Sequence, residues 1–350
     1  MLFISDYPNE ETIKDGMLQR VKAIDKHFED EERTYLHLSF HKNISFSINK
    51  KNNLTIVHAN VFAHPIKIFS IVSKERTMYF HSIYNVLYLL LYFPFLQNKK
   101  MILDVHGAVP EEQKLFKNTF RVWICTIVES IAYKRCTTLI VVTHAMKEHL
   151  TAKYAHMKPP QFIIYPILPD YLLNPAKDAR GLSQRDSNKL TIVYAGNTQS
   201  WQNVELMIEF IKEHNTGEIT YYILSGEKEK MKKMFEEKGL GEPKNIIIDS
   251  VRPDQLSLYY SKAHYGFVLR DNITVNNVAC PTKLVEYMYY GIIPIVKTEK
   301  LGDFSEKGYE YVHYHDFKEQ EKPNISEKNK TIIKDIIDYV YDINLKELIR

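Results

Sequence analysis

Residues 280–296 (CPTKLVEYMYYGIIPIV) hold the side chains whose types and spacing are best suited to chemistry. A Pro-Thr turn ending at Thr282 opens a predicted helix that carries Lys283 and Glu286 on one face, three residues apart. The free N–H groups of a helix N-terminus attract an anion, and Lys283 adds a positive charge. Glu286, one turn later, offers a carboxylate to the vicinal hydroxyls of a ribose. The segment therefore predicts a nucleotide diphosphate site; the alternative is a Rossmann helix with a surface Lys–Glu pair.

This segment resembles the donor-site helix of the GT-B glycosyltransferases, in particular glycosyltransferase family 4 and its relatives in bacterial surface-polysaccharide synthesis. The family pattern is Pro-x-Lys-x-x-Glu-Tyr/Ala-Met/Leu-x-x-Gly-x-Pro-Val, and this chain reads PTKLVEYMYYGIIPIV. The resemblance implies that Thr282, Lys283 and Glu286 bind a nucleoside diphosphate sugar. It also implies transfer of the sugar from UDP or GDP, with retention, to a saccharide or lipid-linked acceptor.

Three further segments extend the resemblance over nearly the whole chain. DYPNEETIKDGMLQR resembles the loop that lies over the donor diphosphate, which makes Gly16 a close-approach candidate; a helix-start glycine is the alternative. TIVYAGNTQSWQNVELM resembles the opening strand and loop of the nucleotide-binding domain, with Gly196 and Asn197 at the turn. SVRPDQLSLYYSKAHYGFVLRDN is similar to a family helix and strand, with His264 in the acidic position and Arg270 after the strand.

The chain departs from the family pattern at two places in the donor site. The family commonly has an Arg and a Lys after the first strand of its second domain, but residues 196–203 (GNTQSWQN) contain no cation. The family often pairs two glutamates eight residues apart, and Val278 stands eight before Glu286. A diphosphate leaving group needs positive charge as its bond to the sugar breaks. We therefore expect Arg270 and Lys283 to supply that charge.

A second group of polar residues follows a predicted strand in the first half of the chain. The segment ILDVHGAVPEE is similar to a family segment beside the acceptor, Asp-x-Arg/His-Gly-x-x-x-Glu-Glu. The resemblance implies that His106 contacts the transferring sugar or the acceptor, and that Asp104 or Glu112 orients the acceptor hydroxyl. A histidine at a strand end is otherwise a structural residue. Four other histidines lack such a context and are expected to be structural: His58, His64, His81 and His144.

Strands and helices alternate along both halves of the chain. Apolar strands separated by helices favour parallel sheets that are buried on both faces. Predicted strands are residues 1–4, 34–38, 55–59, 77–80, 101–105 and 138–142, then 190–195, 219–224, 246–249, 265–269 and 293–296. Five prolines between residues 159 and 175 and a polar run over 177–189 predict a linker.

The predicted fold class is α/β of the GT-B type, with two Rossmann-like doubly wound domains facing each other across a cleft. We expect an acceptor-binding domain over residues 1–175 and a nucleotide-sugar-binding domain over residues 176–329. An amphipathic helix over residues 330–350 is expected to pack back on the first domain. Ligands of open parallel sheets bind outside the carboxyl ends of the strands.

Charge is distributed unevenly between the two halves. Residues 1–175 carry 21 Lys and Arg against 16 Asp and Glu, a net charge of +5. The apolar run over residues 83–96 precedes Lys99 and Lys100, while Lys114, Lys117 and Arg121 recur at helical spacing. An apolar helix with a basic rim is typical of proteins that bind anionic membranes. We expect a cytoplasmic protein at the inner face of the membrane; the alternative is a buried helix and an ordinary solvated face.

The composition of the chain and the absence of certain sequence motifs exclude several classes of protein. Hydrophobic residues make up 45% of the chain and charged residues 25%, which is typical of a globular protein. Three scattered cysteines favour a reducing compartment, and the first residues resemble no secretory signal. Without a GxGxxG sequence, an NAD-dependent oxidoreductase is disfavoured. No Asp-x-Asp motif follows a strand, so we expect no obligatory metal and no cofactor besides the sugar nucleotide. A sugar-nucleotide epimerase and a non-catalytic nucleotide or glycan binder remain alternatives; no nucleic acid partner is expected.

Overall fold

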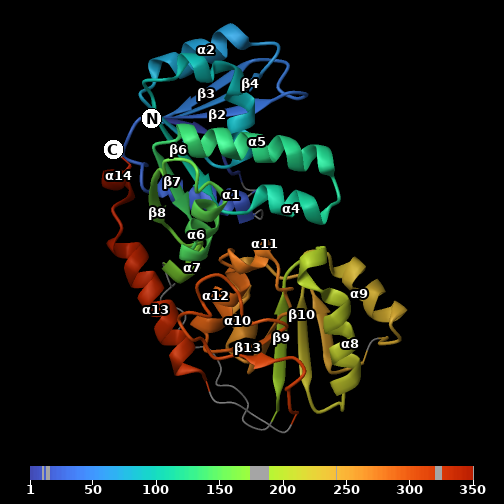
Figure 1. Cartoon of the computed structure of the whole chain (residues 1–350). Helices are drawn as coiled ribbons and strands as arrows, with labels where there is room; N and C mark the ends of the chain where they lie inside the picture. Colours follow the sequence, from blue (N-terminus) through green and yellow to red (C-terminus); the bar gives the residue numbers. More distant parts are fainter. Residues whose placement is uncertain (10–11, 13–15, 174–188, 242, 320–324, 350) are drawn as a thin grey trace. The chain divides into compact units, whose positions relative to one another are not determined.

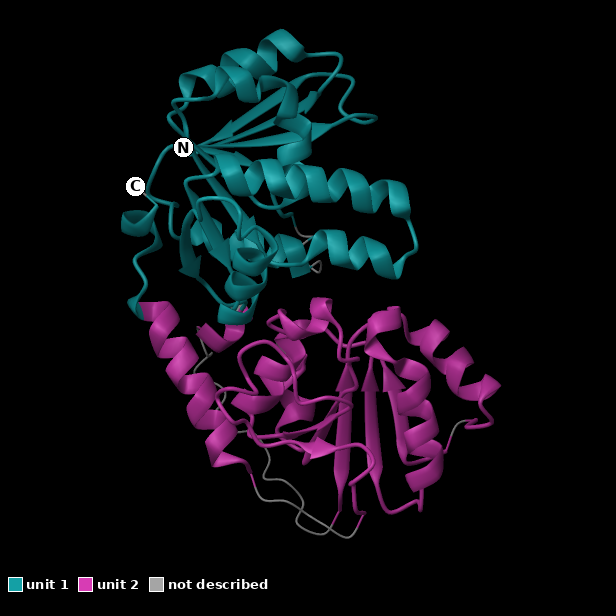
Figure 2. Ribbon diagram, in the orientation of Figure 1, with its two compact units in different colours: residues 1–167, 342–350 teal, residues 168–341 magenta. Residues whose placement is uncertain are grey.

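The computed structural model of the chain contains two compact units (Figure 2). Unit 1 comprises residues 1–167 and 342–350, and unit 2 comprises residues 168–341. The structure describes all residues except 10–11, 13–15, 174–188, 242, 320–324 and 350. The domain boundary expected between residues 175 and 176 lies outside the described residues.

Unit 1 is built on an eight-stranded sheet with the order β3-β4-β2-β1-β5-β6-β7-β8 (Figure 1). Every neighbouring pair is parallel except β3 and β4, which are antiparallel. β1 is buried throughout, which fits its apolar sequence LFI, whereas β3 is exposed throughout. The strands are β1 (Leu2–Ile4), β2 (Arg33–Ser39), β3 (Ser47–Lys51), β4 (Leu54–Asn60), β5 (Thr77–Phe80), β6 (Lys100–Val105), β7 (Thr138–Val141) and β8 (Gln161–Ile164).

The helices of unit 1 divide the apolar run over residues 83–96 differently from the sequence prediction. A helix ends at Leu89 and a 3-10 helix follows, because Pro94 cannot donate a backbone hydrogen bond. Six of its fourteen residues are buried, while Tyr84, Leu91 and Phe95 are 41%, 75% and 69% exposed. The helices are α1 (Gly16–Lys26), α2 (Pro65–Lys74), α3 (Ile83–Leu89), η1 (Leu90–Phe95), α4 (Val109–Leu115), α5 (Thr119–Arg135), α6 (His144–Lys153) and α14 (Leu345–Leu348).

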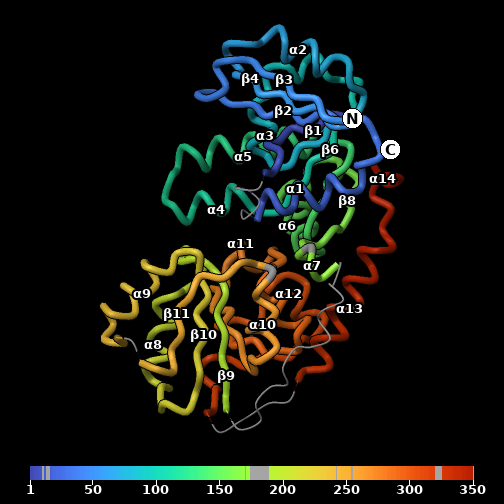
Figure 3. The backbone as a smooth tube through the Cα atoms, turned by 180° about the vertical axis from the view of Figure 1, so that it is seen from behind, coloured from blue at the N-terminus to red at the C-terminus, as the bar shows by residue number. Residues whose placement is uncertain are grey.

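The carboxyl-terminal segment forms two helices instead of the predicted single one. α13 (Glu327–Asp342) belongs to unit 2 as far as Tyr341, and α14 belongs to unit 1. Lys346 of α14 forms ion pairs with Asp30 and Glu31, which follow α1 in unit 1. The chain's first residue and α14 accordingly lie on the same side of unit 1 in both views (Figures 1 and 3).

Unit 2 is built on a six-stranded, fully parallel sheet with the order β11-β10-β9-β12-β13-β14. The first strand of the unit, β9, is central, and the order reverses between β9 and β12, as in Rossmann folds. The strands are β9 (Thr191–Ala195), β10 (Thr220–Leu224), β11 (Ile246–Asp249), β12 (Tyr265–Val268), β13 (Ile293–Val296) and β14 (Val312–His313).

The helices of unit 2 connect these strands, and the core between them and the sheet is apolar. They are α7 (Asp170–Leu173), η3 (Ser200–Gln202), α8 (Val204–His214), α9 (Lys228–Glu237), η4 (Pro253–Gln255), α10 (Ser257–Tyr260), α11 (Thr274–Asn277), α12 (Thr282–Tyr289) and α13. The α/β class with two parallel Rossmann-like sheets is confirmed. Among the described residues, no helix has the length and apolarity that a membrane crossing requires.

Candidate functional site

Helix α12 lies against the point where the strand order of unit 2 reverses. Gly266 of β12 lets it approach, because a Cβ there would lie 2.4 Å from the Tyr287 ring. The Tyr287 hydroxyl in turn accepts a hydrogen bond from the Ala195 N–H at the end of β9 (3.1 Å). Gly291 ends the helix with φ of +65°, a conformation that favours glycine. The predicted helix is thereby confirmed, and it is fixed to the two strands whose carboxyl ends bind ligands in such sheets.

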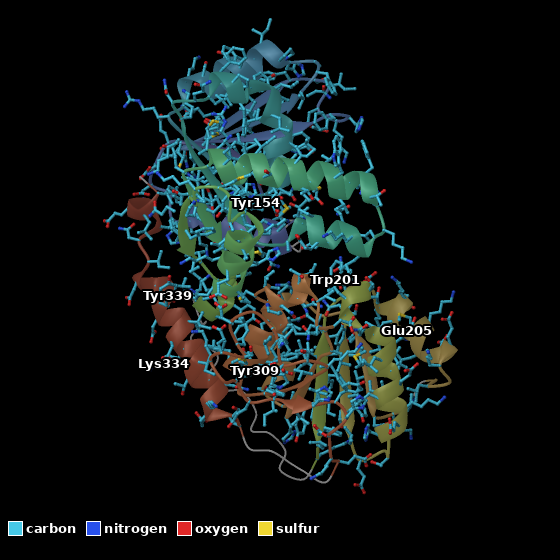
Figure 4. The ribbon with its side chains drawn as sticks, viewed as in Figure 1. Tyr154, Trp201, Glu205, Tyr309, Lys334 and Tyr339 are labelled. Carbon is cyan, nitrogen blue, oxygen red and sulfur yellow. The ribbon has the colours of Figure 1, made fainter. Side chains whose placement is uncertain are left out.

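Lys283 of α12 reaches the loop after β9. Its side chain is 6% exposed, and its Nζ donates to Gln202 Oε1 at 2.9 Å. The ammonium lies 3.9 Å from the centre of the Tyr194 ring, and a Cβ on Gly196 would be 3.1 Å from it. The loop that lacks a cation of its own therefore receives one from α12. Figure 4 labels Trp201 of η3 in this loop.

Arg270 follows β12 and lies near Lys283, and within the described part of the chain it has no ion-pair partner. No ion pair among the described residues joins either cation to a carboxylate, and Arg270 Nε has no hydrogen-bond partner there. Burial lowers the pKa of Arg270 to about 10. Burial and the Arg270 charge lower the pKa of Lys283 well below its ordinary value, although Glu286 opposes the shift. Two desolvated cations that form no ion pair with a carboxylate among the described residues make a site that favours an anion.

Glu286 is 9% exposed, and both of its carboxylate oxygens accept hydrogen bonds from tyrosines. Tyr171 donates to Oε1 at 2.5 Å, and Tyr260 donates to Oε2 at 2.9 Å. Burial raises the pKa of Glu286, while the two hydroxyls and Lys283 act to lower it. Sequence reasoning missed both tyrosines. Tyr260 lies within a segment that resembles the family, which could have indicated it, but Tyr171 lies in the proline-rich part of the predicted linker, where no pattern indicates a site residue.

The other predicted donor-site residues are placed as follows. Gly196 and Asn197 form the turn after β9, where the Asn197 carbonyl accepts a hydrogen bond from the Tyr194 hydroxyl (2.5 Å). Thr282 is the exposed first residue of α12. Gly16 belongs to unit 1, at the exposed start of α1, and a Cβ there would meet no atom within 4 Å. The structure thus places the predicted donor residues of unit 2 near one another, whereas Gly16 belongs to unit 1.

In unit 1, Asp104 is a buried partner of Arg20. Its side chain is fully buried, and Arg20 donates to its two oxygens at 3.0 and 2.9 Å. Burial raises the pKa of Asp104, but the Arg20 charge and the His81 hydrogen bond outweigh it and hold the pKa far below its ordinary value. Arg20 also donates to the Tyr165 carbonyl (2.8 Å). Asp104 therefore ties α1 and the segment after β8 to β6.

His106 and Glu112 lie beyond the end of β6, beside Gly107. A Cβ on Gly107 would lie 2.6 Å from Glu112 Oε1, so this carboxylate packs directly on the backbone next to His106. Burial and the neighbouring Glu111 raise the pKa of Glu112. His106 and Glu112 are both partly exposed, unlike Asp104, which is fully buried.

Glu111 differs from its neighbour because it belongs to an ion-pair network. It accepts from Lys153 Nζ at 2.9 Å, and Lys153 also pairs with Glu129. Burial acts to raise the pKa of Glu111, but His149 and Lys153 lower it to about 2. Tyr154, labelled in Figure 4, completes the network with a hydrogen bond to Glu129 (2.7 Å). The network fixes α4 to α5 and α6, and so fixes the position of Glu112.

The chain matches solved glycosyltransferase structures along its whole length. The match to HepE from Anabaena, solved with UDP and glucose, has a TM-score of 0.67 at 10% identity and covers 99% of this chain and 98% of that one. The match to sucrose-phosphate synthase from Thermosynechococcus elongatus has a TM-score of 0.62 at 13% identity and covers 99% of this chain and 95% of that one. The match to WaaG, a glycosyltransferase involved in lipopolysaccharide biosynthesis, has a TM-score of 0.61 at 13% identity and covers 100% of this chain and 97% of that one.

These matches define the fold of the chain. It is the GT-B fold, with two Rossmann-like sheets, as the sequence predicts. No protein-family model matches the sequence, and a comparison with curated proteins gives no match. The residues of the site therefore carry the argument about function.

Proposed function

We propose that this chain is a glycosyltransferase that takes a sugar from a nucleoside diphosphate sugar. The observation that carries the proposal is that Arg270 and Lys283 lie close together and form no ion pair with a carboxylate of the described residues, with Glu286 one turn along α12. The two cations suit a diphosphate, and the carboxylate suits a ribose diol. This set lies at the switch point of a Rossmann sheet, where nucleotides bind.

The donor is held by unit 2 in this proposal. Arg270 and Lys283 bind the diphosphate together with the backbone at Gly196 and Asn197 and the Thr282 end of α12. The bond between the anomeric carbon and the diphosphate oxygen breaks, and a bond to the acceptor hydroxyl oxygen forms with retention. The cations stabilise the charge that develops on the leaving diphosphate, which takes the place of a bound metal. The UDP complex of the Anabaena protein supports UDP as the nucleotide, with GDP as the other choice.

The acceptor is bound by unit 1 in this proposal. His106 and Glu112 face a saccharide or lipid-linked acceptor, and Glu112 accepts the hydroxyl proton as the new bond forms. Its raised pKa makes it a stronger proton acceptor than an ordinary glutamate. Asp104 acts as a positioning residue, because it is fully buried and pairs with Arg20. We propose that Gly16, at the start of α1, has no side chain so that the backbone there can approach the donor diphosphate closely.

An exposed apolar stripe on α4 and α5 supports a place at the inner face of a membrane. Phe120 and Trp123 are 67% and 61% exposed, with ring centres 6.3 Å apart. Exposed apolar patches of this kind mark binding surfaces. The stripe consists of Leu115, Phe116, Phe120, Trp123 and Ile127, and the cations beside it are Lys114, Lys117 and Arg121. This charge suits anionic headgroups, so we propose peripheral binding that presents a lipid-linked acceptor of surface polysaccharide synthesis.

A thermal-shift screen of nucleoside diphosphates and their sugars tests the proposal. We expect either UDP or GDP to raise the melting temperature of the protein, together with one sugar nucleotide that contains it. The nucleoside alone should raise the melting temperature less. Product analysis with that donor then separates transfer from the alternatives. Nucleotide binding without turnover would indicate a non-catalytic binder, and an altered sugar still attached to its nucleotide would indicate an epimerase.

A further inference from the structure

Tyr171 contacts the proposed donor site from a part of the sequence far from it. It lies on the short helix α7, which precedes the residues that the structure does not describe. Its hydroxyl donates to Glu286 Oε1 at 2.5 Å, across 115 positions in the chain. The ring is partly buried. Desolvation and the Glu286 charge raise the pKa of Tyr171 far above its ordinary value, so the hydroxyl remains a donor.

Tyr260 holds the opposite oxygen of the same carboxylate. It ends α10, is fully buried, and donates to Glu286 Oε2 at 2.9 Å. Its ring packs edge-on against Tyr287 of α12, with ring centres 5.4 Å apart. The two hydroxyls therefore approach Glu286 from two different helices and restrict its rotation.

We propose that Tyr171 and Tyr260 form a clamp that positions the Glu286 carboxylate for the ribose of the nucleotide. An ionised carboxylate offers about four lone-pair sites. The two tyrosine hydroxyls occupy one lone-pair site on each carboxylate oxygen. One site on each oxygen remains to accept a hydrogen bond from each of the two neighbouring ribose hydroxyls. Tyr171 is thus a positioning residue that acts through Glu286. The inference rests on the proposed nucleotide site and adds a residue to it.

The clamp also opposes protonation of a buried carboxylate whose pKa is raised overall. Burial alone raises the pKa of Glu286, and the Tyr171 and Tyr260 hydrogen bonds are the largest effects that oppose the rise. A protonated carboxyl carries a hydrogen on one oxygen and accepts the two ribose hydroxyls less well. Loss of either hydroxyl therefore leaves the carboxylate less ordered and raises its pKa. As the pH is lowered, nucleotide affinity should then be lost at a higher pH than in the wild type.

The test compares Tyr171→Phe, Tyr260→Phe and the double variant with the wild type. UDP and GDP are titrated by calorimetry between pH 5 and 8, and inorganic pyrophosphate serves as the ligand without ribose. Tyr222→Phe in β10 is the control, because its ring contacts Tyr259 and not Glu286. Melting temperatures check that each variant folds.

We expect Tyr171→Phe to weaken the nucleotide about tenfold, as for loss of a hydrogen bond to a charged group, with pyrophosphate unchanged. The pH at which nucleotide affinity is half lost should rise in both single variants and rise further in the double variant. Unchanged or tighter nucleotide binding by a folded Tyr171→Phe would overturn the clamp. A wild type that binds neither UDP nor GDP would instead overturn the nucleotide site itself.

Discussion

Replacing Arg270 and Lys283 together by alanine removes both positive charges from the proposed diphosphate site. Neither cation forms an ion pair with a carboxylate among the described residues, although Lys283 interacts electrostatically with the buried Glu286 and its loss should raise the pKa of that carboxylate. Each charge-assisted bond to a buried anion contributes about 1.5–3 kcal/mol. Loss of both therefore costs about 3–6 kcal/mol of binding free energy, or roughly 10²- to 10⁴-fold in Kd.

The losses of binding free energy in Arg270→Ala and Lys283→Ala should not add up to the loss in the double variant. The charge of Arg270 lowers the pKa of Lys283, so Arg270→Ala leaves a lysine that is protonated over a wider pH range. The remaining ammonium compensates in part for the missing guanidinium. A double-mutant cycle should therefore give single losses that sum to less than the double loss.

Calorimetry with UDP or GDP measures these losses, and the matching nucleoside is the control ligand. Lys238→Ala, which removes an exposed cation paired with Glu209 in the same unit, is the control variant. Burial and the Arg270 charge lower the pKa of Lys283, and a bound diphosphate should raise it again. Nucleotide affinity should therefore fall more steeply with rising pH in the wild type than in Lys283→Ala. Equal losses for nucleotide and nucleoside would refute the reasoning, because the cations would then lie elsewhere.

Three further outcomes follow from the structure. Asp104→Asn leaves Arg20 buried without its counter-ion, so urea unfolding should show a loss of about 3–5 kcal/mol in stability; an unchanged midpoint would contradict the pair. Transfer should persist in EDTA, because Arg270 and Lys283 supply the charge; full loss that Mg²⁺ or Mn²⁺ restores would refute this. Wild-type protein should float with anionic vesicles at low salt, and glutamate at Lys114, Lys117 and Arg121 should abolish flotation but not nucleotide binding. Wild type that stays in the soluble fraction would favour a soluble acceptor.

Patterns that repeat along the chain were predictable from the sequence. Eleven of the strands follow from short apolar runs, and α12 follows from a Pro-Thr start and a Gly291 end. β3 was missed because its sequence SINKK is polar and fully exposed, so no apolar pattern marks it. The single helix expected over residues 83–96 was wrong because Pro94 interrupts the hydrogen bonding.

Contacts between distant positions were not predictable from one sequence. Arg20 pairs with Asp104 across 84 positions, and neither residue's neighbours in the sequence signal the pair. The Tyr171 contact with Glu286 likewise depends on how α7 packs. Sequence reasoning could place Glu286 and Lys283 on one helix face, because that follows from helix geometry alone. It could not show that both are buried, or that burial shifts their pKa values.

The most direct test of the account is the turnover of a Glu286→Ala variant with the donor that the screen selects. Glu286 is the proposed ribose ligand and touches neither the diphosphate nor the acceptor in this account. Release of nucleoside diphosphate from the donor, measured with acceptor present and with folding checked by melting, reports the transfer step. The account predicts that Glu286→Ala removes most of the activity and weakens nucleotide binding while the fold persists. A folded Glu286→Ala enzyme that turns over at the wild-type rate would contradict it.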